Sequence, residues 1–179
     1  MGLKNNYLIT FVIGTRPEAI KMAPLILEFR KSERFKINII LSGQHDEMIR
    51  PIMNFFNLKE DANFNVLGQC NSLEQTTSLI LNELSNYFDK NIPDLVFVQG
   101  DTTTAFVGAL SAFFKKIPIG HVEAGLRTES IFSPFPEEAN RRMISQLASL
   151  HFSPTKMASE NLLKNGICLL YTSDAADEV

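Results

Sequence analysis

Cysteine and histidine are scarce in this sequence, and their positions exclude the common metal and disulfide frameworks. The 179 residues contain two cysteines, Cys70 and Cys168, which lie far apart and form no C-x-x-C pair. This spacing predicts neither a zinc ribbon nor a disulfide framework, and free thiols are typical of a reducing cytosol. The three histidines, His45, His121 and His151, give no metal-binding signature. We therefore expect a cytoplasmic protein without a bound metal.

The sequence also lacks a long apolar run and a strong excess of either charge. No apolar stretch is long enough to span a bilayer, and the run Tyr7–Ile13 leads into a charged motif instead of a signal-peptide cleavage site. The formal net charge of −3 gives no reason to expect a nucleic acid or a membrane as partner. With 45% hydrophobic and 21% charged residues, the chain has the composition of one globular domain with a substantial core.

Several common enzyme motifs are missing. The chain has no G-x-G-x-x-G dinucleotide fingerprint and no P-loop. It has no G-x-S-x-G nucleophile elbow and no Cys/His pairing. These absences leave carboxylates and cations as the candidates for chemistry.

Apolar runs alternate with amphipathic segments in the pattern of β-α-β units. The expected strands are Leu8–Ile13, Phe35–Leu41, Asn63–Leu67, Leu95–Gln99, Ile117–Val122 and His151–Phe152. The expected helices occupy about 15–31, 47–56, 72–90, 102–116 and 137–150, with a last one capped by Ser153-Pro154 and ending at Gly166. This alternation predicts an α/β fold, a Rossmann-like three-layer αβα domain with a mostly parallel sheet.

The last twelve residues do not continue this pattern. After Ile167, where a further strand is expected, the chain reads CLLYTSDAADEV and shows no core-facing pattern after Tyr171. This ending resembles a translated sequencing-adapter end joined to a broken reading frame. We therefore predict that residues 1–167 form one native domain and that residues 168–179 are a non-native tail.

The turn after the first expected strand has the form of a helix start. Thr15 and Glu18 have the spacing of a capping box, with Pro17 in the first turn. The N-terminus of such a helix can bind an anion, and Arg16 and Lys21 add cations beside it. The turn is therefore either a phosphate site or only a capped helix start with a solvent-facing Arg16.

Three acidic residues, Asp101, Glu123 and Glu137, lie at the ends of elements. Ligands bind at the carboxyl ends of the strands in an open parallel sheet. Asp101 can equally be explained as a helix N-cap that accepts from the backbone N–H of Thr103 or Thr104. Glu123 follows an apolar strand and precedes Ala-Gly, so partial burial would suit it to acid–base work.

The helix expected from residue 137 carries two pairs with i, i+4 spacing, Glu137 with Arg141 and Glu138 with Arg142. Each pair can be an ordinary helix salt bridge. The stiff lead-in 133–136 (Ser-Pro-Phe-Pro) instead favours a fixed cluster of charge at the helix start. Two or three acids above a sheet could transfer protons, or they could only bind the hydroxyls of a sugar.

Five segments resemble, in their order and spacing, the non-hydrolysing UDP-N-acetylglucosamine 2-epimerases. They are GTRPEAIKMAP (14–24), SGQH (42–45), QGDTTT (99–104), GHVEAGLRT (120–128) and PEEANR (136–141). The resemblance extends over about residues 8–167. It implies the N-terminal half of a GT-B fold, with the C-terminal domain absent from this chain.

Members of this family interconvert UDP-GlcNAc and UDP-ManNAc without a nicotinamide or other cofactor, in pathways of cell-surface polysaccharide biosynthesis. The implied mechanism removes the C2 proton, eliminates UDP to give enzyme-bound 2-acetamidoglucal, and adds UDP back after protonation from the other face. The resemblance also implies a homodimer for the full-length protein. Because half of the cleft is missing, we expect residues 1–179 alone not to catalyse epimerisation.

The resemblance implies a role for eight residues of this chain. The implied catalytic set is Asp101, Glu123 and Glu137, the implied substrate-binding set is Arg16, Lys21 and Arg141, and Gln44 and His45 fall near a possible regulatory site. Other functions stay open. They are a hydrolysing UDP-GlcNAc 2-epimerase, a non-catalytic nucleotide-sugar-binding module, and a GT-B glycosyltransferase.

Overall fold

The computed structural model describes residues 6–43, 46–66, 68–167 and 172–174. The described strands form one sheet in which every neighbouring pair is parallel. Their spatial order is β3 (Ala62–Asn63), β2 (Phe35–Leu41), β1 (Tyr7–Ile13), β4 (Leu95–Gln99), β5 (Ile119–Val122), β6 (Leu150–Ser153) and β7 (Thr172–Asp174). The order reverses direction between β1 and β4, which makes this point the topological switch of the sheet.

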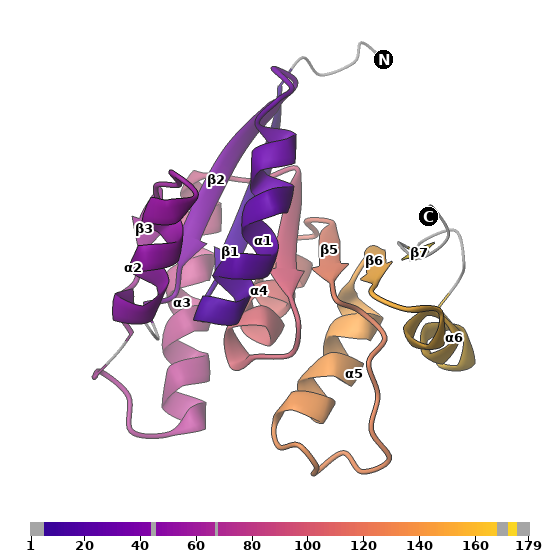
Figure 1. Cartoon of the computed structure of the whole chain (residues 1–179). Coiled ribbons are helices and arrows are strands. Elements are labelled where there is room, and N and C mark those ends of the chain that lie inside the picture. Colours follow the sequence, from indigo (N-terminus) through magenta and orange to yellow (C-terminus); the bar gives the residue numbers. More distant parts are fainter. Residues whose placement is uncertain (1–5, 44–45, 67, 168–171, 175–179) are drawn as a thin grey trace.

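Helices cover both faces of the sheet (Figure 1). They are α1 (Arg16–Phe29), α2 (Asp46–Phe55), α3 (Leu73–Lys90), α4 (Thr103–Phe114), α5 (Glu137–Leu147) and α6 (Lys156–Lys164). On one face α1 and α2 pack against each other, and on the other face α4 packs between α3 and α5. The predicted three-layer αβα domain with a parallel sheet is therefore confirmed.

The central strands β1 and β4 are mostly apolar, as is typical of strands whose two faces are covered by helices. In β1 the side chains alternate between two hydrophobic clusters: Phe11 and Ile13 lie with α1 and α2, whereas Val12 lies with α3 and α4. Phe11 stacks on Phe97 of β4, with ring centroids 5.1 Å apart, and is directly opposite it in the strand register. Gly120 of β5 leaves room for that ring, since a Cβ at this position would lie 2.5 Å from a ring carbon of Phe97.

Several predicted boundaries differ from the observed ones. The third strand has two residues instead of five, because Asn65 adopts a positive φ of 52° and turns the chain away. The helix cap predicted at Ser153-Pro154 is wrong, since Thr155 caps α6 by accepting from the Ala158 N–H at 3.2 Å. The end of the chain adds the three-residue strand β7 beside β6, within the segment that the sequence marks as a non-native tail.

His121 and His151 are buried in the core. His121 is fully buried and its Nε2–H donates to the Gly100 carbonyl at 2.7 Å. Burial lowers the pKa of His121 to about 4, so the ring is neutral at pH 7. The His151 Nε2–H donates to the Ser145 carbonyl at 3.0 Å.

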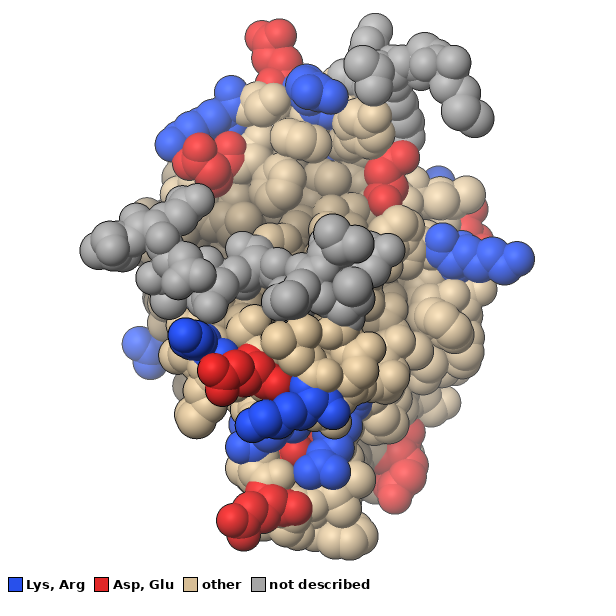
Figure 2. All heavy atoms as spheres, turned by 90° about the vertical axis from the view of Figure 1, so that its right-hand side faces the viewer, with Lys and Arg blue, Asp and Glu red and all other residues tan. Residues whose placement is uncertain are grey.

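Charged side chains of both signs are interspersed on the face at the β6–β7 edge, with broad uncharged areas between them (Figure 2). In the described part of the chain, each helix is too short or too polar to cross a lipid bilayer.

Candidate functional site

A pocket of about 380 Å³ opens at the switch point, where β1, β4 and β5 end and α1 and α4 begin. These helix starts lie at the lower edge of the sheet in Figure 1. The lining residues come from the α1 start, from α2 and from the loops after β4 and β5: Thr15, Arg16, Pro17, Glu18, Lys21, Met48, Gln99, Gly100, Asp101, Thr102 and Glu123. This is where an open parallel sheet presents its ligand site.

Glu18 occupies the inner wall of the pocket and is almost fully buried. Its carboxylate accepts the backbone N–H groups of Gly14 at 2.5 Å and Thr15 at 2.8 Å, so the predicted capping box is present. It also accepts from the Thr102 hydroxyl. Burial raises the pKa of Glu18, against the opposing effect of these donors. Because Glu18 accepts the N–H groups of Gly14 and Thr15, these donors are not available to an anion, and the cations at the pocket are the side chains of Arg16 and Lys21.

Glu123 projects into the pocket from the first residue after β5. Its backbone has a positive φ of 65°, an uncommon conformation for a residue with a side chain. Lys21 Nζ lies 2.6 Å from both carboxylate oxygens, and the Gln99 side-chain amide donates to one of them. Strained backbone of this kind is concentrated at functional sites, which makes Glu123 a candidate for chemistry.

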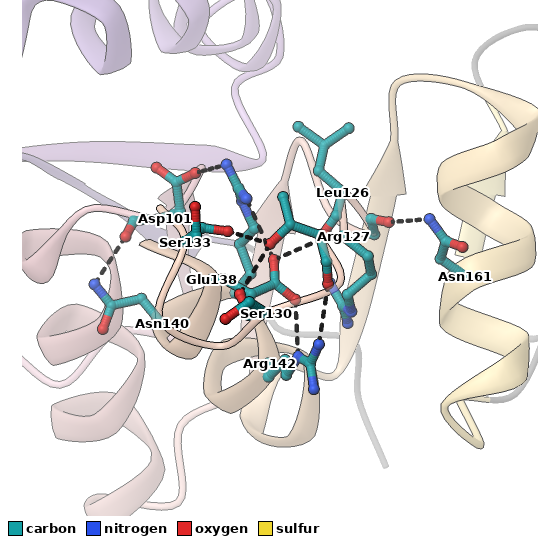
Figure 3. Close-up of polar contacts among 12 residues, drawn as sticks. Asp101, Leu126, Arg127, Ser130, Ser133, Glu138, Asn140, Arg142 and Asn161 are labelled. Atoms are coloured by element: carbon teal, nitrogen blue, oxygen red, sulfur yellow. Dashed lines mark hydrogen bonds and ion pairs between the residues drawn. The ribbon is translucent and has the colours of Figure 1, made fainter. Parts of the chain in front are cut away.

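Asp101 lies at the tip of the turn after β4. Its explanation as an N-cap is wrong: Thr102 caps α4 by accepting from the Ala105 N–H at 3.0 Å. The Asp101 carboxylate instead lies 2.5 Å from an Nη of Arg141, and the Asn140 side chain donates to the Asp101 carbonyl at 2.8 Å. Both partners come from α5, so that helix fixes the Asp101 turn from one side (Figure 3).

Glu138 is the centre of a buried polar cluster behind Asp101 (Figure 3). Its carboxylate pairs with Arg142 at 2.8 Å and with Arg141 at 3.3 Å, and it accepts the Thr128 N–H at 3.1 Å. Burial opposes ionisation, but the hydrogen bonds from Arg142, Thr128 and Arg141 together outweigh it and lower the pKa of Glu138. The expected Glu138–Arg142 pair is confirmed, while Arg141 pairs with Asp101 and Glu138.

Four of the predicted site residues line the pocket, and a fifth is connected to the pocket by an ion pair. Arg16, Lys21, Asp101 and Glu123 line the pocket, and Arg141 reaches it through Asp101. Glu137 begins α5 but is not among the lining residues, and the described residues give its side chain no ion pair with Arg141.

Gln44 and His45 lie outside the residues that the structure describes. Within the described ranges, no three His, Cys, Asp or Glu side chains are grouped closely enough to hold a metal ion.

Sequence reasoning did not find two contributors to the site, Gln99 and Glu138. Gln99 is the last residue of β4, and the polar residue at the end of an apolar run was the available signal. Glu138 was expected in a helix salt bridge or in a charge cluster at the helix start, but its burial was not predicted, because burial of a charged helix residue depends on the loop that folds over it. The pocket combines three acidic side chains, Glu18, Asp101 and Glu123, with the cations Arg16 and Lys21, and can therefore bind an anionic ligand and move a proton.

Comparison with known proteins gives consistent matches. The family model for UDP-N-acetylglucosamine 2-epimerase matches residues 27–170. The UDP-N-acetylglucosamine 2-epimerase of Neisseria meningitidis is 46% identical over 156 residues, which are 87% of this chain and 42% of that protein. The crystal structure of UDP-GlcNAc 2-epimerase from Neisseria meningitidis bound to UDP-GlcNAc superposes with a TM-score of 0.91 at 43% identity, over 93% of this chain and 45% of that one.

The fold also matches a glycosyltransferase. The lipopolysaccharide outer core galactosyltransferase WaaB superposes with a TM-score of 0.66 at 14% identity, over 93% of this chain and 44% of the WaaB chain. This likeness shows a shared half of the GT-B fold and nothing about function. The chain spans about four tenths of the length of the curated relatives that it matches. On the family match and these identities, the chain belongs to the UDP-N-acetylglucosamine 2-epimerase family.

Proposed function

We propose that this chain is the N-terminal half of a non-hydrolysing UDP-N-acetylglucosamine 2-epimerase that interconverts UDP-GlcNAc and UDP-ManNAc. Residues 1–167 would form the native domain, residues 168–179 a non-native tail, and a C-terminal domain would complete the cleft. The observation that carries the proposal is that Asp101, Glu123 and Lys21 line one pocket at the switch point. The enzyme would work in the cytoplasm as a homodimer, without a cofactor.

The proposed reaction needs a base, an acid and a site for a leaving diphosphate. A carboxylate removes the C2 proton, the C–H electron pair forms the C1–C2 double bond, and the C1–O bond breaks with its electrons going to UDP. The product held in the site is 2-acetamidoglucal. Return of a proton to the opposite face of C2 and of UDP to C1 gives the epimer, and no electron is lost or gained.

The geometry supports assigning these roles to the polar residues of the pocket. Glu123 and Asp101 have their carboxylates in the pocket lining and suit proton transfer. Arg16 and Lys21 supply positive charge for the diphosphate at a pocket open to solvent. Glu137 is the first residue of α5, the helix that carries Arg141. We assign Glu137 to a part of the site that would be completed when the second domain closes against this one.

The first experiment is to sequence the source locus across codon 167. A frame that continues into a second Rossmann-like domain gives the whole protein for assay with UDP-GlcNAc. Formation of an equilibrium mixture of UDP-GlcNAc and UDP-ManNAc is the expected result. Release of UDP with free ManNAc would instead identify a hydrolysing enzyme, and nucleotide-sugar binding without turnover would identify a binding module.

The isolated chain gives the complementary test. We expect residues 1–179 to show no turnover of UDP-GlcNAc, because the second half of the cleft is needed to orient the substrate. Measured turnover by this chain would contradict the division into two half-sites. A locus that ends at codon 179 would instead contradict the proposed non-native tail, and the question would become whether this half binds a nucleotide sugar alone or needs a separately encoded partner half.

A further inference from the structure

We propose that Glu138 is a positioning residue, whose buried carboxylate holds the guanidinium of Arg141 against Asp101 and fixes the loop after β5 to α5. The proposal rests on the function proposed above, since that function assigns Asp101 to proton transfer. Glu138 is not among the lining residues of the switch-point pocket, so it is assigned no contact with the substrate.

The surroundings of Glu138 are polar, although its side chain is fully buried. Oε1 accepts from Arg142 Nε at 2.8 Å, whereas Oε2 accepts from the Thr128 N–H at 3.1 Å and from Arg141 Nη1 at 3.3 Å. Arg142 Nη2 also donates to the Thr128 carbonyl at 3.1 Å. A single carboxylate therefore joins the loop that follows β5 to the first turns of α5.

Arg141 connects this buried carboxylate to the pocket. Its Nη1 faces Glu138, and its Nη2 lies 2.5 Å from Asp101 Oδ2. The Arg141 side chain is 16% exposed and that of Asp101 23% exposed, so water competes only weakly for this pair. A planar guanidinium that is anchored at one end presents its other end in one direction, which gives the Asp101 carboxylate a defined orientation.

The charge balance explains why a carboxylate is needed at position 138. The carboxylates of Asp101 and Glu138 face the guanidinium groups of Arg141 and Arg142, and the charge of Arg127 also interacts with Glu138. If Glu138 becomes neutral, these guanidinium groups remain near one another with only Asp101 to offset their charge. Arg141 then loses its ion pair with Glu138, and its guanidinium can reorient toward solvent or substrate. Glutamine keeps the volume and one acceptor oxygen, so Glu138→Gln removes the charge without opening a cavity.

The kinetic test uses the whole protein. We expect Glu138→Gln to lower kcat by up to about a hundredfold, the effect of misplacing an active-site group by a change outside the reacting centre. We expect KM to change less than about threefold, because Glu138 does not contact the substrate. Glu138→Asp restores the charge and should recover part of kcat. In an Arg141→Gln background, Glu138→Gln should cost less than about twofold, because its effect passes through Arg141.

Glu28→Gln is the matched control. Glu28 forms an exposed i, i+3 ion pair with Lys31 at 2.6 Å, far from the pocket, so the same change of side chain should leave kcat unaltered. Equal kcat values for Glu138→Gln and Glu28→Gln would overturn the proposal. An undiminished effect of Glu138→Gln in the Arg141→Gln background would overturn it as well.

A second measurement does not depend on activity. In residues 1–179, ¹⁵N-edited NMR should show slowly rotating Nη protons for Arg141, which disappear in Glu138→Gln and persist in Glu28→Gln. Far-UV circular dichroism checks that both variants are folded. An unchanged Arg141 signal in Glu138→Gln would overturn the positioning role even in an active enzyme. Lack of epimerisation by the unmodified whole protein would instead refute the proposed function and leave the NMR comparison to decide the role of Glu138.

Discussion

At the scale of single residues, Glu123 combines an unfavourable backbone conformation with polar contacts to its carboxylate. Its φ of 65° has a steric cost of about 1–2 kcal/mol for a residue with a Cβ. The Lys21 ammonium and the Gln99 amide both hold the carboxylate in the pocket. Glycine would avoid the backbone cost but would remove the carboxylate, so the position is better explained by chemistry than by stability.

The Glu123→Gln substitution tests this explanation in the whole protein. Glutamine can keep the contact with Lys21 but cannot accept a proton, so we expect kcat to fall by about a hundredfold to ten-thousandfold. The free energy of unfolding should change by less than about 1 kcal/mol, since the Lys21–Glu123 pair is partly exposed. Steady-state kinetics with UDP-GlcNAc and urea denaturation measure the two effects. Turnover within threefold of the parent would remove Glu123 from the reaction.

His121 gives the fold a pH dependence. Its pKa is about 4 in the folded protein and near 6.5 when unfolded, so the unfolded chain binds more protons between these values. Stability from His121 is therefore complete above about pH 6.5 and is lost as the pH falls toward 4. Between pH 7 and pH 5 the loss is about 2 kcal/mol.

The matched variant is His121→Gln, which keeps a side-chain N–H for the Gly100 carbonyl but does not titrate. Urea denaturation at pH 7 and pH 5 should show about 2 kcal/mol less acid sensitivity for this variant than for the unmodified chain. Identical acid sensitivity would mean that other groups dominate the titration, and the assignment to His121 would be wrong.

At the scale of elements, the contact between the loop after β5 and helix α6 depends on a glycine. Gly125 has a φ of 91°, its carbonyl accepts from the Asn161 side chain at 3.1 Å, and a Cβ there would lie 2.1 Å from the Ala158 carbonyl oxygen. The helix α6 also packs against β6. Crowding therefore adds to the cost of the positive φ.

Gly125→Ala should lower the free energy of unfolding by about 2–4 kcal/mol, from backbone strain and overpacking together. Gly166→Ala is the matched control, since Gly166 has a φ of 80° and open space around a Cβ. That control should cost only about 1 kcal/mol. Chemical denaturation compares the two variants, and equal losses would show that crowding against α6 contributes nothing.

The sequence predicts elements well where each carries its own signal. Apolar runs such as Phe35–Leu41 and Leu95–Gln99 match β2 and β4 residue for residue, since both faces of these strands are buried. The capping box at Thr15 and Glu18 is local and was also found. The N-cap of α4 was predicted incorrectly, because Asp101 and Thr102 both suit that position. Only the position of Arg141, a residue distant in sequence, draws Asp101 away from the helix end.

The site was predicted less completely than the fold, because several of its contacts join residues that are distant in the sequence. Residues at strand ends, such as Asp101 and Glu123, can be placed at one edge of the sheet once the strands are known. The burial of Glu138 depends on the loop after β5, and no periodic pattern encodes the path of that loop. Glu18 was predicted as a cap, but its contact with Thr102 joins two different strand ends and appears only in three dimensions.

At the scale of the whole molecule, the last described strand is a short edge strand of the sheet. β7 has three residues, pairs only with β6 at the sheet edge, and lies in the segment proposed to be non-native. We expect removal of residues 168–179 to lower the free energy of unfolding by no more than about 1 kcal/mol, a small part of the stability of a domain. Urea denaturation of chains 1–167 and 1–179 compares them. A loss of several kcal/mol would show that the tail is an integral part of the fold.

The capped start of α1 bears on the proposed binding of a nucleotide sugar. Because Glu18 accepts the N–H groups of Gly14 and Thr15, the proposed attraction for a diphosphate comes from Arg16 and Lys21, both exposed to solvent. Fields from exposed charges decay over about 8 Å at physiological ionic strength. Under the proposed function, capture of the nucleotide sugar by these side chains should therefore weaken as the ionic strength rises, and inorganic pyrophosphate should compete for the same cations.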